Sequence, residues 1–356
     1  MRGTSAPVSF FPQEKQKRER VKRSSSLFME AKEAIRFFLD TNLTNFNEKA
    51  LALFHYQADN NPVYRRYLEL LGVDALSVQS LDAVPFLPID FFKAHEVLST
   101  SEPPQNIFLS SSTSGRGQSR HFVPHPELYE RCFTETFRLF YGKPEEYCFL
   151  ALLPGYLERE GSSLVYMVRQ LISMSKDTDS GFYLNDHERL QETLIKKEIE
   201  AVPVLLLGVS HALLDFAEKH AITPNPHLIV METGGMKGRK KEILREELHR
   251  LLKQSFSVHD IHSEYGMTEL MSQAYSKRAG IYHCPPWMKV LVKRQDDPFS
   301  SFEKEIRGRL AIIDLANVYS CAFIETEDLG VVHRDGSFEV LGRMDFSETR
   351  GCNVMV

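Results

Sequence analysis

The sequence predicts an α/β protein in which a largely parallel sheet is covered by helices and is followed by a β-rich C-terminal part. Strand-sized apolar runs alternate with amphipathic helical patterns from about residue 147 to 261. After about residue 305 the helical patterns stop, and short runs typical of strands follow one another. The length of 356 residues allows about two domains at roughly 150 residues each.

Composition narrows the class of protein. Hydrophobic residues are 42% and charged residues 26%, which is ordinary for a globular enzyme. The 43 Lys and Arg against 48 Asp and Glu give a formal charge of -5, which argues against a general nucleic-acid binder. No apolar run approaches the roughly 18 residues of a membrane span. Five scattered cysteines without a C-x-x-C pair indicate no disulfide framework and favour a cytoplasmic protein.

Residues 1–28 form a basic extension that differs from the rest of the chain. Six Lys and Arg crowd into residues 15–23, and three serines follow them. One reading is an arm that touches RNA or another anionic surface. The reading we prefer is a disordered extension ahead of a start at Met29, because the segment has no periodic apolar pattern that could bury surface.

The remaining elements can be placed in chain order. Residues 29–100 are expected to be mostly helical, with a proline-braced extended stretch at 84–88. Further helices are expected at 162–175, 187–199, 212–217 and 239–253. Strands are expected at 107–109, 148–153, 202–207, 227–231, 257–261, 310–314, 322–326, 330–333 and 338–341. The turn Asp335-Gly336 predicts a hairpin between the last two strands.

A Ser/Gly-rich loop at residues 110–119 follows the expected strand 107–109. Its small hydroxyl residues and glycines would let backbone N–H groups and side-chain hydroxyls converge on phosphate oxygens. The loop matches neither the Walker A pattern nor the dinucleotide fingerprint. The alternative reading is a Ser/Gly surface loop without a ligand.

The stretch 263–270 follows the expected strand 257–261 and would lie at a strand's carboxyl end, where open α/β sheets bind ligands. Tyr265 offers a flat face for a base and Thr268 a hydroxyl for a phosphate. Glu269 is a hard oxygen ligand of the kind that Mg²⁺ prefers. The alternative is an ordinary strand-to-helix turn with a polar cap.

Two more charged candidates for a ligand site lie in the β-rich C-terminal part. Asp328 is expected on a turn after a strand, where its carboxylate could grip ribose hydroxyls. Arg343 follows the last strand of the expected hairpin.

Together and in this order, these stretches resemble the adenylate-forming superfamily. Its phosphate-loop, Y-G-x-T-E, T-G-D-L and G-R-x-D…R-G motifs correspond to residues 110–115, 265–269, 326–329, and 342–345 with 350–351. The nearer resemblance is to the acyl-protein synthetase (LuxE-type) branch, and it covers nearly the whole chain from Met29. It is carried by residues 85–89, 119–122, 153–156, 162–165, 232–238, 314–317 and 350–353.

The resemblance implies an enzyme that uses ATP and Mg²⁺ to convert a carboxylic acid, expected to be a fatty acid, to acyl-AMP. It implies a catalytic role for Thr268, Glu269 and Arg343, with Glu269 also binding the metal. It implies that the nucleotide is bound by Ser111, Thr113, Ser114, Gly115, Gly234, Gly235, Tyr265 and Asp328.

The resemblance also implies a second step at Cys352, where an acyl thioester forms before the acyl group passes to a partner such as an acyl reductase. Arg350 beside it would lower the pKa of the thiol. The other four cysteines are expected to be buried core thiols, namely Cys132, Cys148, Cys284 and Cys321.

Three features depart from the superfamily pattern. Ser112 and Glu327 stand where its motifs have glycine, and the chain ends at Val356 without the lid domain that carries a catalytic lysine. The acyl-protein synthetases share that ending. The expected organisation is therefore a basic extension (1–28), an adenylate-forming domain (29–341) and a short tail (342–356) that carries Cys352. An acyl-CoA ligase of the phenylacetate-CoA-ligase type and a non-catalytic acyl-adenylate-binding subunit remain as alternatives.

Overall fold

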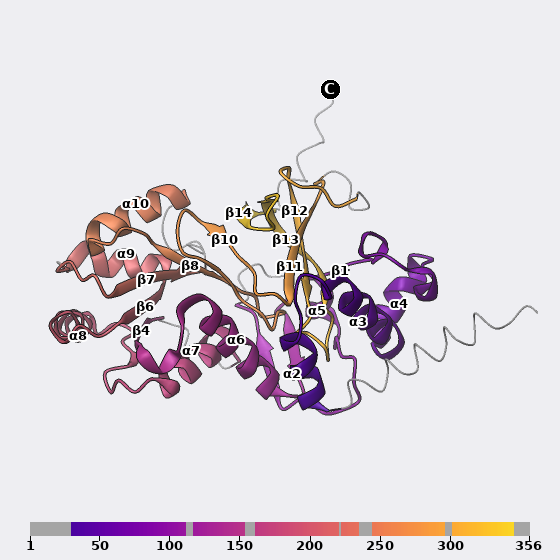
Figure 1. Cartoon of the computed structure of the whole chain (residues 1–356), viewed down its shortest axis with the longest axis horizontal. Coiled ribbons are helices and arrows are strands. Elements are labelled where there is room, and N and C mark those ends of the chain that lie inside the picture. The colour runs from indigo at the N-terminus through magenta and orange to yellow at the C-terminus, as the bar shows by residue number, and fades with distance from the viewer. Residues whose placement is uncertain are drawn as a thin grey trace, which may run out of the picture.

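Two six-stranded sheets organise the chain, and Figure 1 shows where their strands and the surrounding helices lie. The structure is a computed structural model, and it describes residues 30–111, 117–153, 161–220, 222–234, 244–295 and 301–344. The basic extension and the tail beyond residue 344 lie outside these ranges.

The first sheet is parallel over five of its six strands. Its order is β5 (Gly181–Phe182), β4 (Cys148–Leu152), β6 (Val204–Val209), β7 (Leu228–Thr233), β8 (His262–Tyr265) and an antiparallel β9 (Ala274–Ser276). Every residue of β4 and β6 is buried, as expected of parallel strands with both faces covered. In Figure 1, α6 (Pro126–Tyr141) and α7 (Ser163–Met174) lie on one side of this sheet, and α9 (Ser210–Lys219) and α10 (Arg245–Phe256) on the other. Helix α8 (His187–Glu200) precedes β6.

The second sheet is antiparallel and comes mostly from the end of the described chain. Its order is β10 (Ile281–Tyr282), β14 (Phe338–Arg343), β13 (Phe323–Val332), β12 (Arg307–Asp314) and β11 (Met288–Lys293), with β1 (Leu87–Pro88) paired parallel to β13. A separate hairpin joins β2 (Asn106–Leu109) to β3 (Arg120–Val123).

Aromatic packing attaches the N-terminal helices to the second sheet. These helices are α2 (Ala31–Leu39), α3 (Phe46–Asn60), α4 (Pro62–Leu70) and the short α5 (Phe91–Ala94). Phe323 of β13 contacts the rings of Phe54, Tyr64 and Phe86, and all four side chains are buried. This cluster fixes β13, the strand that carries Asp328, against the helices.

The predicted fold class is confirmed, and most of the expected elements occur within a few residues of their expected bounds. The strand expected at 257–261 is wrong, because α10 continues to Phe256 and β8 begins only at His262. Ser257 ends the helix in the left-handed conformation, with φ of 53°. The two strands expected at 322–326 and 330–333 are one continuous strand, β13.

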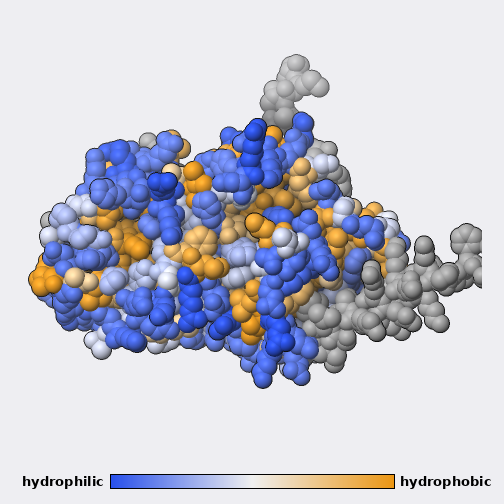
Figure 2. All heavy atoms as spheres, in the orientation of Figure 1, coloured by the Kyte–Doolittle hydropathy of each residue, from blue (hydrophilic) through white to orange (hydrophobic). Residues whose placement is uncertain are grey.

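The surface in Figure 2 is largely hydrophilic, with hydrophobic residues in separate patches. The most exposed large apolar side chains are those of Leu43, Leu244 and Ile199, which come from different parts of the chain. Single exposed apolar residues are ordinary on protein surfaces. Within the described ranges, no helix has the length and apolar character that crossing a membrane requires.

Candidate active site

Tyr265 and Asp328 join the two sheets at the carboxyl end of β8. The Tyr265 hydroxyl donates a hydrogen bond to Asp328 Oδ2 at 2.9 Å. Arg343, at the end of β14, donates from Nε to Asp328 Oδ1 at 3.0 Å. The Arg343 side chain is 65% exposed, whereas that of Asp328 is 9% exposed. Three residues that the sequence singled out separately therefore form one cluster with a single solvent-facing charge.

The ring of Tyr265 is enclosed. Its centroid lies 5.3 Å from that of Phe338 and 5.8 Å from that of Tyr282. Burial, with the nearby charge of Asp328, raises the pKa of Tyr265 well above its ordinary value. The phenol therefore stays protonated and serves as a donor to Asp328.

Asp328 is expected on a turn after a strand, and the structure places it within a strand instead. Asp328 lies inside β13 at a bulge, where residues 326–328 oppose only Leu310 of β12. The Thr326 hydroxyl donates to the Leu310 carbonyl at 2.8 Å and accepts from the Asp328 backbone N–H at 3.1 Å. A bulge bends a strand and redirects a side chain, and here it directs the carboxylate towards Tyr265.

Glu269 places a second buried carboxylate near this cluster. The residue is 5% exposed, and burial raises the pKa of its carboxyl group. A hydrogen bond from the Ser119 side chain and the charges of Arg343 and Lys93 act in the opposite direction. Because the net shift is still upward, these groups do not fully replace the lost solvation, and a bound cation would do so. One buried carboxylate is compatible with a magnesium ion that takes its other ligands from phosphate and water, and the metal role of Glu269 stays a prediction.

Thr268 precedes Glu269, and its backbone is held from outside the loop. His121 Nδ1 lies 2.8 Å from the Thr268 carbonyl oxygen. Burial lowers the pKa of His121 to about 4, so the ring is neutral at pH 7, and its Nδ1–H donates to the carbonyl. The Thr268 side chain is partly exposed, and its phosphate contact stays a prediction.

The candidate phosphate loop lies in the sequence between β2 and β3 of the hairpin. At its base, Ser110 N donates to Ser119 O at 3.1 Å, and Ser119 N donates to Ser110 Oγ at 2.9 Å. Ser111 lies just inside the described residues, whereas Thr113, Ser114 and Gly115 lie outside them. Since Ser119 also contacts Glu269, the base of the loop lies beside the candidate metal ligand.

Gly234 follows β7 next to the end of β8. Its φ of +69° is in the left-handed region that glycine favours. Its carbonyl accepts a hydrogen bond from Ser210 Oγ at 2.8 Å. Gly235 lies outside the described residues. The β7 and β8 ends are adjacent, since Thr233 pairs with Glu264 in the parallel register.

Sequence reasoning missed Glu264, which lies directly behind this edge. A Cβ on Gly266 would lie 2.5 Å from Glu264 Oε1, so a side chain at position 266 would require that carboxyl group to shift. Burial raises the pKa of Glu264 to about 7, a hydrogen bond from Thr233 lowers it, and the nearby Glu232 raises it. The available signal was a polar pair, Ser263 and Glu264, directly before the Tyr265 motif.

The described residues offer few ligands for a metal ion. These residues contain no group of three or more His, Cys, Asp or Glu that could hold a metal ion. A magnesium ion at Glu269 would therefore rely on one carboxylate, phosphate oxygens and water, as is usual for Mg²⁺ with nucleotides.

The expectation of core thiols is confirmed for Cys132, Cys148 and Cys321, whereas Cys284 is partly exposed. Cys352 lies outside the described residues.

No protein-family model and no curated protein matches this chain. Solved structures do match. One is an open conformation of 2-hydroxyisobutyryl-CoA ligase in complex with 2-HIB-AMP and CoA, with a TM-score of 0.64 and 12% identity over 86% of this chain and 72% of that one. The same enzyme in the postadenylation state with 2-HIB-AMP gives a TM-score of 0.60 and 13% identity over 87% and 70%. ATP-bound MatB from Rhodopseudomonas palustris matches with a TM-score of 0.51 and 16% identity, over 76% of this chain and 52% of that one.

At these identities the similarity concerns the fold. The chain has the α/β fold of adenylate-forming ligases, including the β-rich C-terminal part that the sequence predicted. It spans about half the length of the MatB chain.

Proposed function

We propose that this chain is an ATP-dependent acyl-protein ligase. It would activate a carboxylic acid, preferably a fatty acid, as acyl-AMP and then transfer the acyl group to a protein cysteine. The observation that carries the proposal is the meeting of Tyr265, Asp328 and Arg343 where the two sheets join. The bound 2-HIB-AMP and ATP in the similar structures support the nucleotide part.

The nucleotide would lie along the carboxyl ends of β7 and β8. Gly234 and Gly235 would let the adenine approach the backbone beside Tyr265. Asp328 would accept hydrogen bonds from the ribose hydroxyls, and the exposed guanidinium of Arg343 could turn towards the phosphates. Ser111, Thr113, Ser114 and Gly115 would supply hydroxyl and backbone donors to the phosphate oxygens.

Glu269 would hold the magnesium ion beside the phosphates, and Thr268 would donate its hydroxyl to a phosphate oxygen. When bound, Mg²⁺ supplies charge neutralisation for the departing pyrophosphate. The protein's own part is to keep the Glu269 carboxylate buried and hydrogen-bonded to the Ser119 side chain, within reach of the charge of Arg343.

The proposed chemistry has two displacements. In the first, a carboxylate oxygen bonds to the α-phosphorus of ATP, the bond to the β-phosphate oxygen breaks, and pyrophosphate leaves with the electron pair. In the second, a thiolate bonds to the acyl carbon, the bond to the AMP oxygen breaks, and AMP leaves. The thiol has by then lost its proton to solvent. Both steps depend mainly on positioning and charge compensation.

Cys352 is the proposed acceptor, on the family resemblance, and the described cysteines are poor candidates. Burial raises the pKa of Cys148, Cys284 and Cys321 to about 12 and raises that of Cys132 still further. Such thiols carry almost no thiolate at neutral pH. We further propose that the protein works in the cytoplasm and passes its acyl group to a reductase partner.

A second candidate is an acyl-CoA ligase, which the CoA bound in a 2-hydroxyisobutyryl-CoA ligase structure favours. A non-catalytic acyl-adenylate-binding subunit is a third. Acid-dependent AMP release, measured with and without CoA, separates the three. Release that requires CoA supports the second candidate, and no release in either condition supports the third.

Labelling with a radioactive acid tests the acceptor directly. The wild-type protein should acquire a hydroxylamine-labile acyl label, and Cys352→Ser should lose it because serine stays protonated without a dedicated base. Cys284→Ser serves as the matched control and should keep the label. A labile label on the Cys352→Ser protein would show that another group is the acceptor.

A further inference from the structure

The backbone around Glu269 is held by three side chains that lie elsewhere in the sequence. We call residues 268–272 the Glu269 loop. His121 belongs to β3, whereas Asp314 and Asn317 belong to the end of β12 and the connection that follows it. All three side chains are almost completely buried, with exposed fractions of 1%, 0% and 1%.

Two of these side chains bind consecutive carbonyls. His121 Nδ1 donates to the Thr268 carbonyl at 2.8 Å. Asn317 Nδ2 donates to the Glu269 carbonyl at 2.8 Å and also to the Cys321 carbonyl at 2.9 Å. Two consecutive peptide groups are thus fixed in orientation, which restricts the backbone angles from which the Glu269 side chain starts.

The third side chain binds the end of the loop. Asp314 Oδ2 accepts from the backbone N–H groups of Met271 at 2.8 Å and Ser272 at 2.9 Å. Its Oδ1 accepts from the Ser272 hydroxyl at 2.6 Å and from Ala316 N at 3.1 Å. Burial raises the pKa of Asp314 and these donors oppose the rise, so the carboxylate depends on the loop as the loop depends on it.

We propose that His121, Asn317 and Asp314 are positioning residues that fix the Glu269 loop so that the Glu269 carboxylate faces Ser119 at the base of the candidate phosphate loop. This inference rests on the proposed role of Glu269 as the metal ligand. The three residues lie in two of the segments that carry the family resemblance, 119–122 and 314–317. In the positioning role they act on the Glu269 loop and do not have to touch a substrate.

The connection that carries Asn317 is itself held from the N-terminal helices. Gln57 of α3 donates from Nε2 to the Asn317 carbonyl at 2.8 Å, and its Oε1 accepts from Ala322 N at 2.9 Å. Gln57 is fully buried. Helix α3 therefore supports the Glu269 loop indirectly, through Gln57 and the connection that carries Asn317. The buried polar side chains of Gln57 and Asn317 both have hydrogen-bonding partners in that chain of contacts.

A purely structural role and a positioning role differ in what they change. Loss of general stability would weaken nucleotide and metal binding together. Loss of positioning would weaken metal binding, because Glu269 would point elsewhere, while Tyr265 and Asp328 would still bind the nucleotide. The informative quantities are therefore the Mn²⁺ affinity in the presence of ATP and the ATP affinity without metal.

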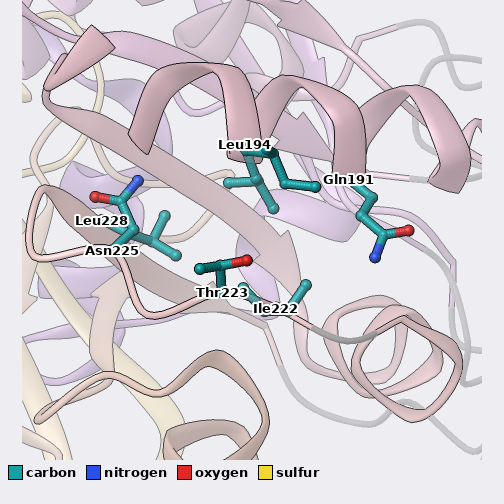
Figure 3. A pocket seen from close by; sticks show the side chains of 7 residues that line it. Gln191, Leu194, Ile222, Thr223, Asn225 and Leu228 are labelled. Atoms are coloured by element: carbon teal, nitrogen blue, oxygen red, sulfur yellow. The ribbon is translucent and has the colours of Figure 1, made fainter. Parts of the chain in front are cut away.

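The test compares three variants of the full chain with one control. Asn317→Asp places an oxygen against two carbonyls, His121→Leu removes the donor, and His121→Asn restores a donor near the Nδ1 position. The control is Asn225→Asp. Asn225 is 5% exposed, accepts from His227 N at 2.8 Å and lines a small pocket beside α8 (Figure 3), before β7.

Mn²⁺ titrations followed by electron paramagnetic resonance should show an affinity about tenfold weaker for Asn317→Asp and His121→Leu. Metal-free ATP affinity should change less than about twofold, and His121→Asn should recover most of the Mn²⁺ affinity. Asn225→Asp should match the wild type in both quantities.

Wild-type Mn²⁺ affinity in His121→Leu, or an equal loss of Mn²⁺ and ATP affinity in folded variants, would overturn the proposal. If Asn317→Asp fails to fold, the pair of His121 variants decides. If the wild-type protein binds Mn²⁺ with ATP but activates no acid, the proposed function is refuted. The inference about the Glu269 loop is then still decided by the Mn²⁺ and ATP affinities of the variants. Wild-type protein that binds no Mn²⁺ with ATP would refute the inference itself.

Discussion

The hydroxyl of Tyr265 lies 2.9 Å from a carboxylate oxygen of Asp328, although one residue ends a strand of the parallel sheet and the other lies within the antiparallel sheet. This hydrogen bond fixes the relative position of the two sheets at the candidate site. The other oxygen of Asp328 pairs with Arg343, whose side chain is the exposed member of the cluster.

Asp328→Asn should weaken ATP binding about tenfold, because a charged acceptor for the ribose hydroxyls is replaced by a neutral amide. Isothermal titration calorimetry measures this directly. Asp335→Asn, at the exposed turn of the β13–β14 hairpin, is the matched control and should leave the affinity unchanged. Wild-type affinity in the Asp328 variant would remove this carboxylate from the nucleotide site.

Glu269→Gln should slow acid-dependent pyrophosphate exchange roughly 100-fold while metal-free ATP binding stays unchanged. The substitution keeps the shape of the side chain and removes the charge that would hold the magnesium ion. Glu102→Gln, an exposed carboxylate on another part of the surface, serves as the control. An unchanged exchange rate at every Mg²⁺ concentration would contradict the metal role.

Glu264 should make the stability of the protein depend on pH. Burial raises the pKa of this carboxyl group from 4.5 to about 7. Between these values the folded protein keeps the proton while the unfolded chain loses it, so the free energy of unfolding falls as pH rises and levels off above about 7.

Glu264→Gln cannot ionise and should lack this dependence. Between pH 4.5 and 8, the free energy of unfolding of the wild type should therefore decrease by roughly 3 kcal/mol relative to the variant. Urea unfolding at several pH values measures the difference. Parallel pH profiles for the two proteins would show that the pKa of Glu264 is the same in the folded and unfolded states.

Phe323→Ala should reduce the free energy of unfolding by about 3–5 kcal/mol, because it empties the centre of a fully buried aromatic cluster. Leu43→Ala is the control, since Leu43 is 93% exposed and its loss should cost less than about 0.5 kcal/mol. Urea unfolding followed by circular dichroism gives both values. A loss below about 1 kcal/mol at Phe323 would show that the cluster can collapse around the gap.

The strands and helices with strong apolar periodicity could be predicted from the sequence. β4 and β6 are apolar runs, and the hairpin turn at Asp335-Gly336 is a local signal that the structure confirms, with φ of 88° at Gly336. β8 could not be placed, because its residues 262–265 are mostly polar and form a strand only by pairing with Met231 and its neighbours on β7.

The composition of the candidate site was predictable, but its connections were not. The bulge that redirects Asp328 depends on a hydrogen bond between Thr326 and Leu310, a pairing between two strands that no local pattern encodes. The support of Glu269 by Asn317 joins residues 48 positions apart. Such contacts follow from the tertiary arrangement of the sheets, so single-sequence reasoning could identify the carboxylates but not what holds them.

The central claim is that this chain activates a carboxylic acid by forming an acyl-adenylate. Exchange of radioactive pyrophosphate into ATP, driven by a panel of carboxylic acids of increasing chain length, tests it most directly. The account predicts exchange that requires both Mg²⁺ and an acid, is strongest with fatty acids, and is strongly slowed in Glu269→Gln. No acid-dependent exchange in a folded protein that binds ATP would contradict the claim.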